Sequence, residues 1–283
     1  MKFGLMFANT GPFIQPEGLT LLAQTAEEVG VESLWTVEHV VVPTGYESTY
    51  PYSQDGKMPG SETAPIPDPL VWLTYAAAVT KKINLASGII ILPQRHPLYL
   101  AKEAATIDML SGGRLILGVG IGWLEEEFKA LDVPFASRGA ITDESIEALR
   151  DLWSEGTSEH KGAHYCWPSV ESNPKPLRGK IPIVIGGHSK PAARRAARLG
   201  DGFFPARSDK LEECLVELRT ECERIGRDPN EIEVTTGGIP TPDEVKRLED
   251  LGVSRFTFGP PGYTPDALRE GLEKLGNELI SKF

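Results

Sequence analysis

The sequence predicts a (β/α)8 TIM barrel with insertion loops, and three observations support this prediction. Strand patterns and helix patterns alternate eight times along the chain. The 283 residues, 40% of them hydrophobic, are enough for the core of one such barrel. No linker divides residues 1–283, so we expect a single domain. A doubly wound sheet is the alternative, but Ala8-Asn9-Thr10-Gly11, after the first strand pattern, lacks the G-x-G-x-x-G motif.

The expected strands are mostly short apolar runs rich in β-branched residues, as in strands that are buried on both faces. Their ranges are Phe3–Phe7, Ser33–Val37, Asn84–Leu92, Arg114–Gly120, Ile181–Ile185, Asp201–Pro205, Glu233–Thr236 and Arg255–Phe258. In a barrel of this kind the active site lies at the C-terminal ends of the strands. Polar residues at those ends are therefore the candidate functional residues.

The expected helices have apolar residues at helical spacing. They cover residues 19–29, Asp68–Thr80, Pro97–Leu110, Trp123–Leu131, Thr142–Trp153, Ala192–Leu199 and Ser208–Ile225, and two more begin at Thr241-Pro242 and Thr264-Pro265. Pro43–Pro67 and Glu155–Lys180 show no periodicity and are expected to be irregular loops. Loops of this length are usually functional lids or disordered segments. Three tyrosines would give the first loop an apolar or aromatic wall, namely Tyr46, Tyr50 and Tyr52.

A turn into a helix follows the strand Ile181–Ile185. Gly186-Gly187 ends the strand, Ser189 is a good N-cap residue, and Pro191 is tolerated in a first helical turn. Backbone N–H groups and the positive end of the helix dipole meet there, so the turn can hold an anion such as phosphate. Lys190 would add a charge. An ordinary strand-to-helix turn is the alternative.

The second strand is followed by Glu38 and His39. Neighbouring residues of a strand point in different directions, so we expect only one of the two to face the pocket. A histidine beside a carboxylate can give or take a proton near neutral pH, which makes His39 the candidate catalytic residue. A purely structural histidine is the alternative.

Glycines mark the third and fourth strands. Gly88 interrupts a β-branched strand, which indicates a bulge or the close approach of a ligand. Gly118, Gly120 and Gly122 alternate before Trp123, so a flat molecule could lie against this backbone and stack on the indole; tight barrel packing is the alternative.

Three charged residues near these strands have less specific interpretations. Arg95 could hold an anion or stay solvated. Asp108 and Arg114 precede the fourth strand, at the end of the barrel away from catalysis, and are expected to form a structural pair.

Composition limits the partners. A net charge of −11 argues against nucleic acid or an anionic membrane as the main partner. The N-terminal residues read directly as a strand rather than as a signal, and no run approaches the roughly 18 apolar residues of a membrane span. Of the three cysteines, Cys214 and Cys222 have helical core spacing, which fits a reducing cytoplasm. We expect a small-molecule substrate and assign no metal site.

Together these segments resemble the luciferase-like monooxygenase superfamily, and within it the branch that uses coenzyme F420. The matching segments are Ser33–His39, LASGIIILPQRHP (Leu85–Pro97), IDMLSGGRLILGVGIGW (Ile107–Trp123), PIVIGGHS and AARLGDGFF. The resemblance covers nearly the whole chain. FMN-dependent members share most of these motifs, so they are less specific to the cofactor.

The resemblance implies where a deazaflavin would bind. Its ring would lie over the third strand, where the family often has a non-prolyl cis peptide that maps to Gly88-Ile89. His39 maps to the acid–base histidine and Glu38 to its acidic neighbour, which contacts the cofactor. The phosphate site maps to Gly186, Gly187, His188 and Ser189, and the glycine-rich wall to Gly120, Gly122 and Trp123.

Trp123 departs from a related pattern. It stands where F420-dependent sugar-phosphate dehydrogenases have a glutamate, which argues against sugar-phosphate oxidation. The resemblance also implies a homodimer.

Three functions remain open at this point. The first is an F420-dependent oxidoreductase that moves a hydride between the deazaflavin and a small organic substrate. The second is an FMN-dependent monooxygenase, and the third is a non-catalytic protein that binds flavin or deazaflavin. The absence of a glutamate at position 123 favours the third, whereas the presence of His39 argues against it.

Overall fold

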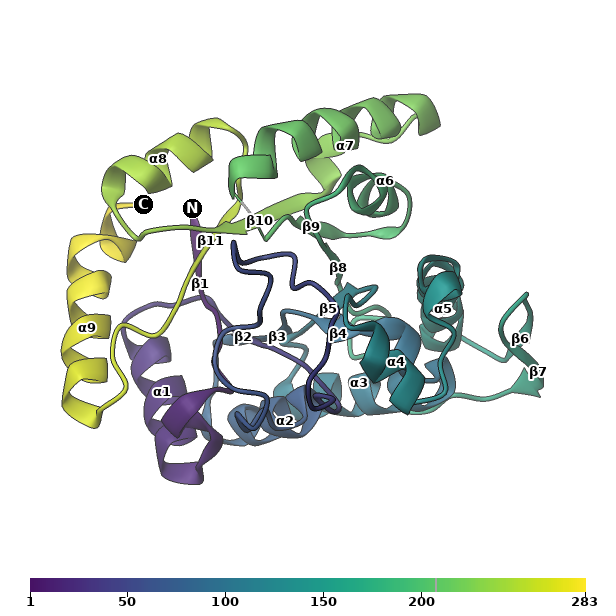
Figure 1. Ribbon diagram of the computed structural model, residues 1–283, viewed down its shortest axis with the longest axis horizontal. Coiled ribbons are helices and arrows are strands. Elements are labelled where there is room, and N and C mark those ends of the chain that lie inside the picture. Colours follow the sequence, from purple (N-terminus) through teal and green to yellow (C-terminus); the bar gives the residue numbers. More distant parts are fainter. Residues whose placement is uncertain (207) are drawn as a thin grey trace.

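The computed structural model describes residues 1–206 and 208–283. Within them, eight parallel strands close into a barrel in the order β1-β2-β3-β5-β8-β9-β10-β11, and β11 returns to pair with β1. The barrel strands are β1 (Lys2–Leu5), β2 (Ser33–Thr36), β3 (Asn84–Ser87), β5 (Leu115–Gly120), β8 (Ile183–Gly186), β9 (Gly202–Phe204), β10 (Glu233–Gly237) and β11 (Arg255–Phe258). The predicted (β/α)8 fold is therefore confirmed (Figure 1).

Helices separate the strands along the chain and lie around the barrel (Figure 1). They are α1 (Pro16–Glu28), α2 (Pro69–Val79), α3 (Pro97–Ser111), α4 (Glu125–Ala130), α5 (Arg138–Trp153), α6 (Lys190–Leu199), α7 (Leu211–Ile225), α8 (Pro242–Asp250) and α9 (Pro265–Glu278). Every predicted helix is present, although α5 begins at Arg138 rather than at Thr142. The two termini meet, since the Met1 amino group donates to the Phe283 carbonyl oxygen at 3.2 Å.

The predicted strand Asn84–Leu92 is divided. After β3 the chain leaves the sheet at Gly88-Ile89 and returns as β4 (Ile90–Ile91), which pairs with Val119 and Gly120 of β5. The peptide bond between Gly88 and Ile89 is cis, at the position that the family resemblance implied.

The barrel encloses a small aromatic core. It consists of Trp35, Ala86, Ile116, Val184 and Phe204, and the Trp35 and Phe204 rings meet edge to face at 5.3 Å. A Cβ on Gly88 would lie 3.1 Å from Trp35 Cε3, so this indole packs directly against the point where the strand is interrupted. A larger apolar cluster fills the space between strands and helices, and it includes the buried thiols of Cys214 and Cys222.

The prediction of an irregular loop over Glu155–Lys180 is wrong in part. This segment contains an antiparallel hairpin of β6 (Ser158–Lys161) and β7 (Cys166–Val170), which stands out from the barrel in Figure 1. The hairpin depends on contacts with distant parts of the chain, which the spacing of apolar residues in the sequence does not reveal. The Glu144 carboxylate of α5 accepts backbone N–H groups at the hairpin turn, for example from Tyr165 at 2.8 Å, and the Trp167 indole is buried.

Asp108 and Arg114 do not form the expected pair with each other. The Asp108 carboxylate accepts the Leu177 N–H at 2.9 Å. The Arg114 guanidinium donates instead to carbonyl oxygens of Ala77 and Ile83 and to Thr80, because these acceptors surround it at the end of α2. Both residues are structural, but they hold different parts of the chain.

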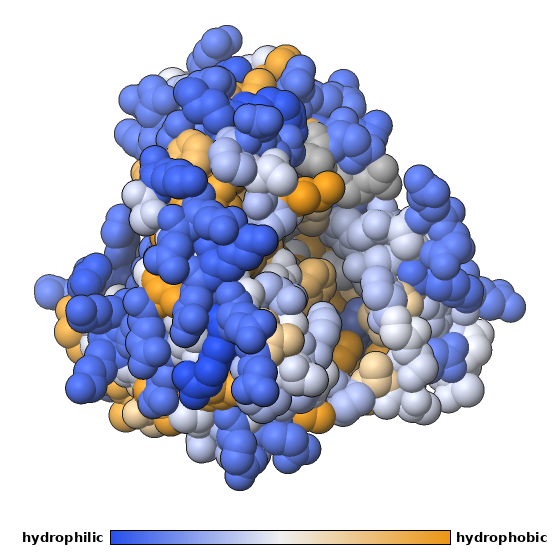
Figure 2. Space-filling view, turned by 90° about the vertical axis from the view of Figure 1, so that its left-hand side faces the viewer, coloured by the Kyte–Doolittle hydropathy of each residue, from blue (hydrophilic) through white to orange (hydrophobic). Residues whose placement is uncertain are grey.

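The outer surface is mainly hydrophilic. Figure 2 shows a largely blue face and a recess in it with pale and orange residues inside. Among the described residues, no helix is both long enough and apolar enough to cross a membrane.

Candidate active site

His39 lies just beyond the C-terminal end of β2. Its side chain is 9% exposed, and its Nδ1 is 3.0 Å from Glu127 Oε2. The Trp123 ring stands edge to face against the imidazole, with 5.7 Å between the ring centroids. The structure therefore places the predicted catalytic histidine between a carboxylate and an indole at the mouth of the barrel.

Glu127 is a site residue that the sequence analysis missed. It belongs to α4, its side chain is fully buried, and its Oε1 accepts the N–H groups of Val40 at 2.7 Å and Val41 at 3.3 Å. The signal for it was weak, because α4 has six residues and three consecutive glutamates. A helix this short offers too little periodicity to show which of the three carboxylates faces inward.

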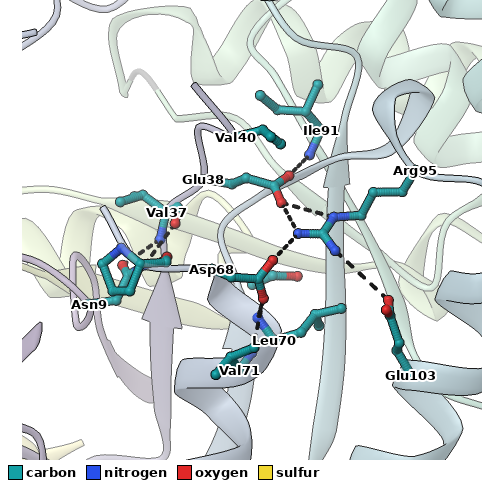
Figure 3. Close-up of polar contacts among 12 residues, drawn as sticks. Asn9, Val37, Glu38, Val40, Asp68, Leu70, Val71, Ile91, Arg95 and Glu103 are labelled. Carbon is teal, nitrogen blue, oxygen red and sulfur yellow. Dashed lines mark hydrogen bonds and ion pairs between the residues drawn. The ribbon is translucent and has the colours of Figure 1, made fainter. Parts of the chain in front are cut away.

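Glu38 belongs to a separate network, drawn in Figure 3. Its Oε1 accepts Arg95 Nε at 2.9 Å, and its other oxygen accepts the Ile91 N–H. Arg95 also pairs with Asp68 at 2.6 Å and lies 3.8 Å from Glu103. Burial raises the pKa of the Glu38 carboxyl, and the Arg95 guanidinium opposes this rise.

The expected direction of neighbouring residues is thus confirmed, since Glu38 and His39 have different surroundings. Both carboxylate oxygens of Glu38 accept hydrogen bonds from the protein. Direct contact of Glu38 with a cofactor stays a prediction. Arg95 pairs with carboxylates of the protein itself, those of Glu38 and Asp68.

Asn9 forms hydrogen bonds with both ends of the long loop that follows β2, at Val37 and Pro67. Its Nδ2 donates to the Val37 carbonyl oxygen at 2.9 Å and to that of Pro67 at 3.2 Å. Its Oδ1 accepts the Val37 N–H at 2.8 Å, and the side chain is completely buried. Figure 3 shows Asn9 beside Val37, near Asp68. These hydrogen bonds hold the two ends of the loop together. Within it, Pro43–Pro67 is irregular as predicted.

Tyrosines of this loop form a wall across the barrel mouth. Tyr50 stands 5.1 Å from the Trp123 ring and 5.2 Å from Tyr52, and Tyr52 stands 4.9 Å from the His188 ring. Tyr46 contacts Trp123 at 5.5 Å. Burial, followed by the nearby tyrosines, raises the pKa of Tyr50 to about 12, so its phenol stays neutral at physiological pH. The predicted aromatic wall is present and joins residues from the ends of β5 and β8.

Glycines at or just after the ends of β5 and β8 make room for neighbouring side chains. A Cβ on Gly120 would lie 2.7 Å from Ile89 Cδ1, and one on Gly186 would lie 2.6 Å from Ile89 Cγ2. Gly122 has a φ of +79°, and a Cβ there would lie 2.6 Å from Phe128 Cε2. Close packing therefore accounts for the absence of side chains at these positions. A cofactor contact at Gly120, Gly122 or Gly88-Ile89 remains a prediction.

The turn after β8 has the geometry that the sequence predicted for an anion site. Gly187 has a φ of +123°, and the Ser189 hydroxyl caps α6 by accepting the Ala192 N–H at 3.4 Å. Within the described residues, the backbone N–H groups of Ser189 and Lys190 make no hydrogen bond, so two donors remain at the start of this ten-residue helix. The Lys190 ammonium lies 3.7 Å from Glu213, and both side chains are about half exposed.

Comparisons with known proteins place the chain in a family. A model of the luciferase-like monooxygenase family matches residues 1–247. An uncharacterised protein of Mycobacterium tuberculosis is 33% identical over 272 residues, which are 92% of this chain and 94% of that protein. An F420-dependent glucose-6-phosphate dehydrogenase of Amycolatopsis mediterranei is 30% identical over 193 residues, which are 67% of this chain and 53% of the enzyme.

Solved structures agree in fold. The coenzyme F420 dependent tetrahydromethanopterin reductase of Methanopyrus kandleri matches with a TM-score of 0.79 at 19% identity and covers 100% of this chain and 99% of its own. The monooxygenase RslO1 of Streptomyces bottropensis matches with a TM-score of 0.78 at 22% identity over 100% and 99% of the two chains. The family match extends over most of the barrel and includes the segments that carry His39, Trp123 and the turn after β8, and the chain therefore belongs to the luciferase-like monooxygenase family.

Proposed function

We propose that this protein is an F420-dependent oxidoreductase that transfers a hydride between the deazaflavin and a small organic substrate. One observation carries the proposal: an imidazole, His39, lies at the end of a barrel strand between the Trp123 ring and the buried Glu127 carboxylate. An imidazole is suited to moving a proton near neutral pH. Burial raises the pKa of the Tyr50 phenol to about 12, which makes it a poor candidate for the same task.

The residues at the barrel mouth fit a flavin-like cofactor in their chemistry. The Ser189 and Lys190 N–H groups at the start of α6 would hold a phosphate, together with the turn from Gly186 to His188. The half-buried residues Gly88 and Ile89 and the Trp123 indole would border the ring. A bound deazaflavin supplies the hydride acceptor or donor, and the protein must supply the matching proton.

In this proposal His39 gives the proton to a substrate heteroatom, or takes it, as the hydride is transferred. The wall of Tyr46, Tyr50 and Trp123 keeps water from the reacting atoms and favours an uncharged, apolar substrate. Trp123, where F420-dependent sugar-phosphate dehydrogenases have a glutamate, makes a sugar phosphate a poor substrate.

F420 is preferred over FMN because two of the relatives named above are F420-dependent enzymes. The alternative, an FMN-dependent monooxygenase, is supported by the family description and by the monooxygenase among the structural relatives. The presence of His39, buried against a carboxylate, argues against a non-catalytic cofactor-binding protein.

The test is the reoxidation of reduced F420 by the wild-type protein with a panel of small carbonyl compounds and quinones. We expect turnover with at least one acceptor. His39→Ala should lower that turnover by about 10²–10⁴-fold, the usual effect of losing a general acid or base. His164→Ala is the control, because His164 is an exposed residue of the β6–β7 hairpin. A His39→Ala protein as active as wild type would contradict the proposal, and no turnover of reduced F420 with any acceptor would favour the FMN-dependent or the non-catalytic alternative.

A further inference from the structure

The Glu127 carboxylate connects three groups of the segment that follows β2. Its Oε2 lies 3.0 Å from His39 Nδ1, and its Oε1 accepts the N–H groups of Val40 and Val41. The side chain has no exposed area. A buried carboxylate whose hydrogen bonds within the described part of the chain all go to one short segment has the arrangement expected of a group that fixes the position of that segment.

The contact with His39 also decides which ring nitrogen carries the hydrogen. An ionised carboxylate can only accept hydrogen bonds, so Nδ1 must donate. In the neutral imidazole, Nε2 is then the bare nitrogen. Among the described residues Nε2 has no hydrogen-bond partner, which leaves it available to a bound molecule.

The same helix turn also holds the Pro43–Pro67 loop. Glu126, the residue before Glu127, accepts the Ser48 hydroxyl at 2.6 Å and the Glu47 N–H at 2.8 Å. Two consecutive carboxylates of α4 therefore hold the His39 segment and the first part of the Pro43–Pro67 loop. The imidazole is oriented by the same short helix that holds the loop carrying the aromatic wall.

We propose that Glu127 is a positioning residue that keeps His39 in the Nδ1–H tautomer and presents Nε2 to the substrate. This inference rests on the proposed function for its catalytic consequence, but the tautomer itself does not. In the reaction, the proton is exchanged between Nε2 and the substrate heteroatom, and Glu127 stays ionised and stabilises the imidazolium form. The arrangement is that of a carboxylate that orients a catalytic histidine.

The first test needs no cofactor. The ¹⁵N NMR spectrum of histidine-labelled protein, with His39 assigned by its loss in His39→Ala, reports which ring nitrogen carries the hydrogen. Wild type should show Nδ1–H in the neutral ring. Glu127→Gln should move the hydrogen to Nε2, since the amide NH2 can donate to Nδ1. Glu125→Gln is the matched control, because Glu125 lies in the same turn, its side chain is 44% exposed and its partner is Lys129.

The second test measures catalysis with reduced F420 and an accepted substrate. Glu127→Gln should lower kcat by at least about 10²-fold, with the F420 dissociation constant unchanged, because the wrong tautomer faces the substrate. Glu127→Asp should recover part of this loss, and Glu125→Gln should behave like wild type. If Glu127 had only a structural role, the loss of kcat in Glu127→Gln would instead parallel a fall in the melting temperature. The tautomer of His39 would then not change.

Different results would contradict the positioning role of Glu127 and the proposed function. A neutral Nε2–H tautomer in wild type would overturn the positioning role, and this result is independent of whether Glu127→Gln folds. A wild-type kcat in Glu127→Gln with a reversed tautomer would also overturn it. Normal turnover in His39→Ala, together with Nδ1–H in wild type, would instead contradict the proposed function and leave the orientation of the ring as inferred.

Discussion

At the scale of single residues, the neighbours Glu38 and His39, which follow β2, lie in different surroundings. His39 has a carboxylate on one ring nitrogen and the edge of an indole beside it, whereas Glu38 lies with Arg95 in a buried ion network. Alternation along an extended chain explains why the two residues have different surroundings. The sequence predicted this alternation and the place of His39 at the end of the strand, but it did not predict the partners, since Glu127 and Arg95 lie far from them along the chain.

The ion network of Figure 3 gives a prediction about stability. Arg95→Met should lower the free energy of unfolding by about 3–5 kcal/mol, because Glu38, whose side chain is 1% exposed, would be left as a buried charge without its partner. Urea unfolding measures this difference. Lys129→Met removes the partner of Glu125 in an exposed pair and should change stability by less than about 1 kcal/mol. Equal effects of the two substitutions would show that the buried network does not depend on Arg95.

At the scale of elements, the barrel could be predicted well and the connections only in part. The eight strands and the helices between them follow from apolar runs, helical spacing and caps such as Ser189 and Thr241. The β6–β7 hairpin was missed because the Glu144 carboxylate and the burial of Trp167 hold it, and both are contacts between distant parts of the chain. Gly120 and Gly122, at and just after the end of β5, were expected to border a flat ligand, with tight packing as the alternative. Ile89 packs beside Gly120 and Phe128 beside Gly122, and a ligand contact there stays a prediction.

The contact between α4 and the loop gives a prediction about pH. The Ser48 hydroxyl above all, and the Glu47 N–H after it, lower the pKa of Glu126 from 4.5 to about 2. Since the folded pKa is the lower one, the stabilisation is complete above pH 4.5 and is lost as the pH falls towards 2. Glu126→Gln should thus reduce the free energy of unfolding at neutral pH, by about 1 kcal/mol or less because solvent screens this carboxylate.

The difference between wild type and Glu126→Gln should shrink as urea unfolding is repeated at lower pH. Glu17→Gln, a change of the same kind in the first turn of α1, controls for the loss of a surface charge. A difference that is constant from neutral pH to pH 2 would show that the Glu126 charge does not contribute to holding the loop.

At the scale of the whole molecule, the homodimer implied by the family resemblance stays a prediction. The surface of α2 is consistent with it, because this helix has no charged residue while Val71 is 70% exposed and Tyr75 is 43% exposed. An uncharged face on a chain with a net charge of −11 can meet a copy of itself without strong repulsion. Sedimentation equilibrium should show a dimer, and a monomer at high concentration would contradict this.

The whole barrel brings the ends of β2, β5 and β8 together, and ring contacts from His39 through Trp123, Tyr50 and Tyr52 to His188 connect them. The central claim is that this mouth binds a deazaflavin beside His39. A fluorescence titration with F420, and separately with FMN, tests it most directly in wild type and in His39→Ala. We expect saturable F420 binding at micromolar concentrations or below, weaker FMN binding, and nearly the same F420 affinity in His39→Ala. Micromolar FMN binding with no binding of F420 would contradict the account.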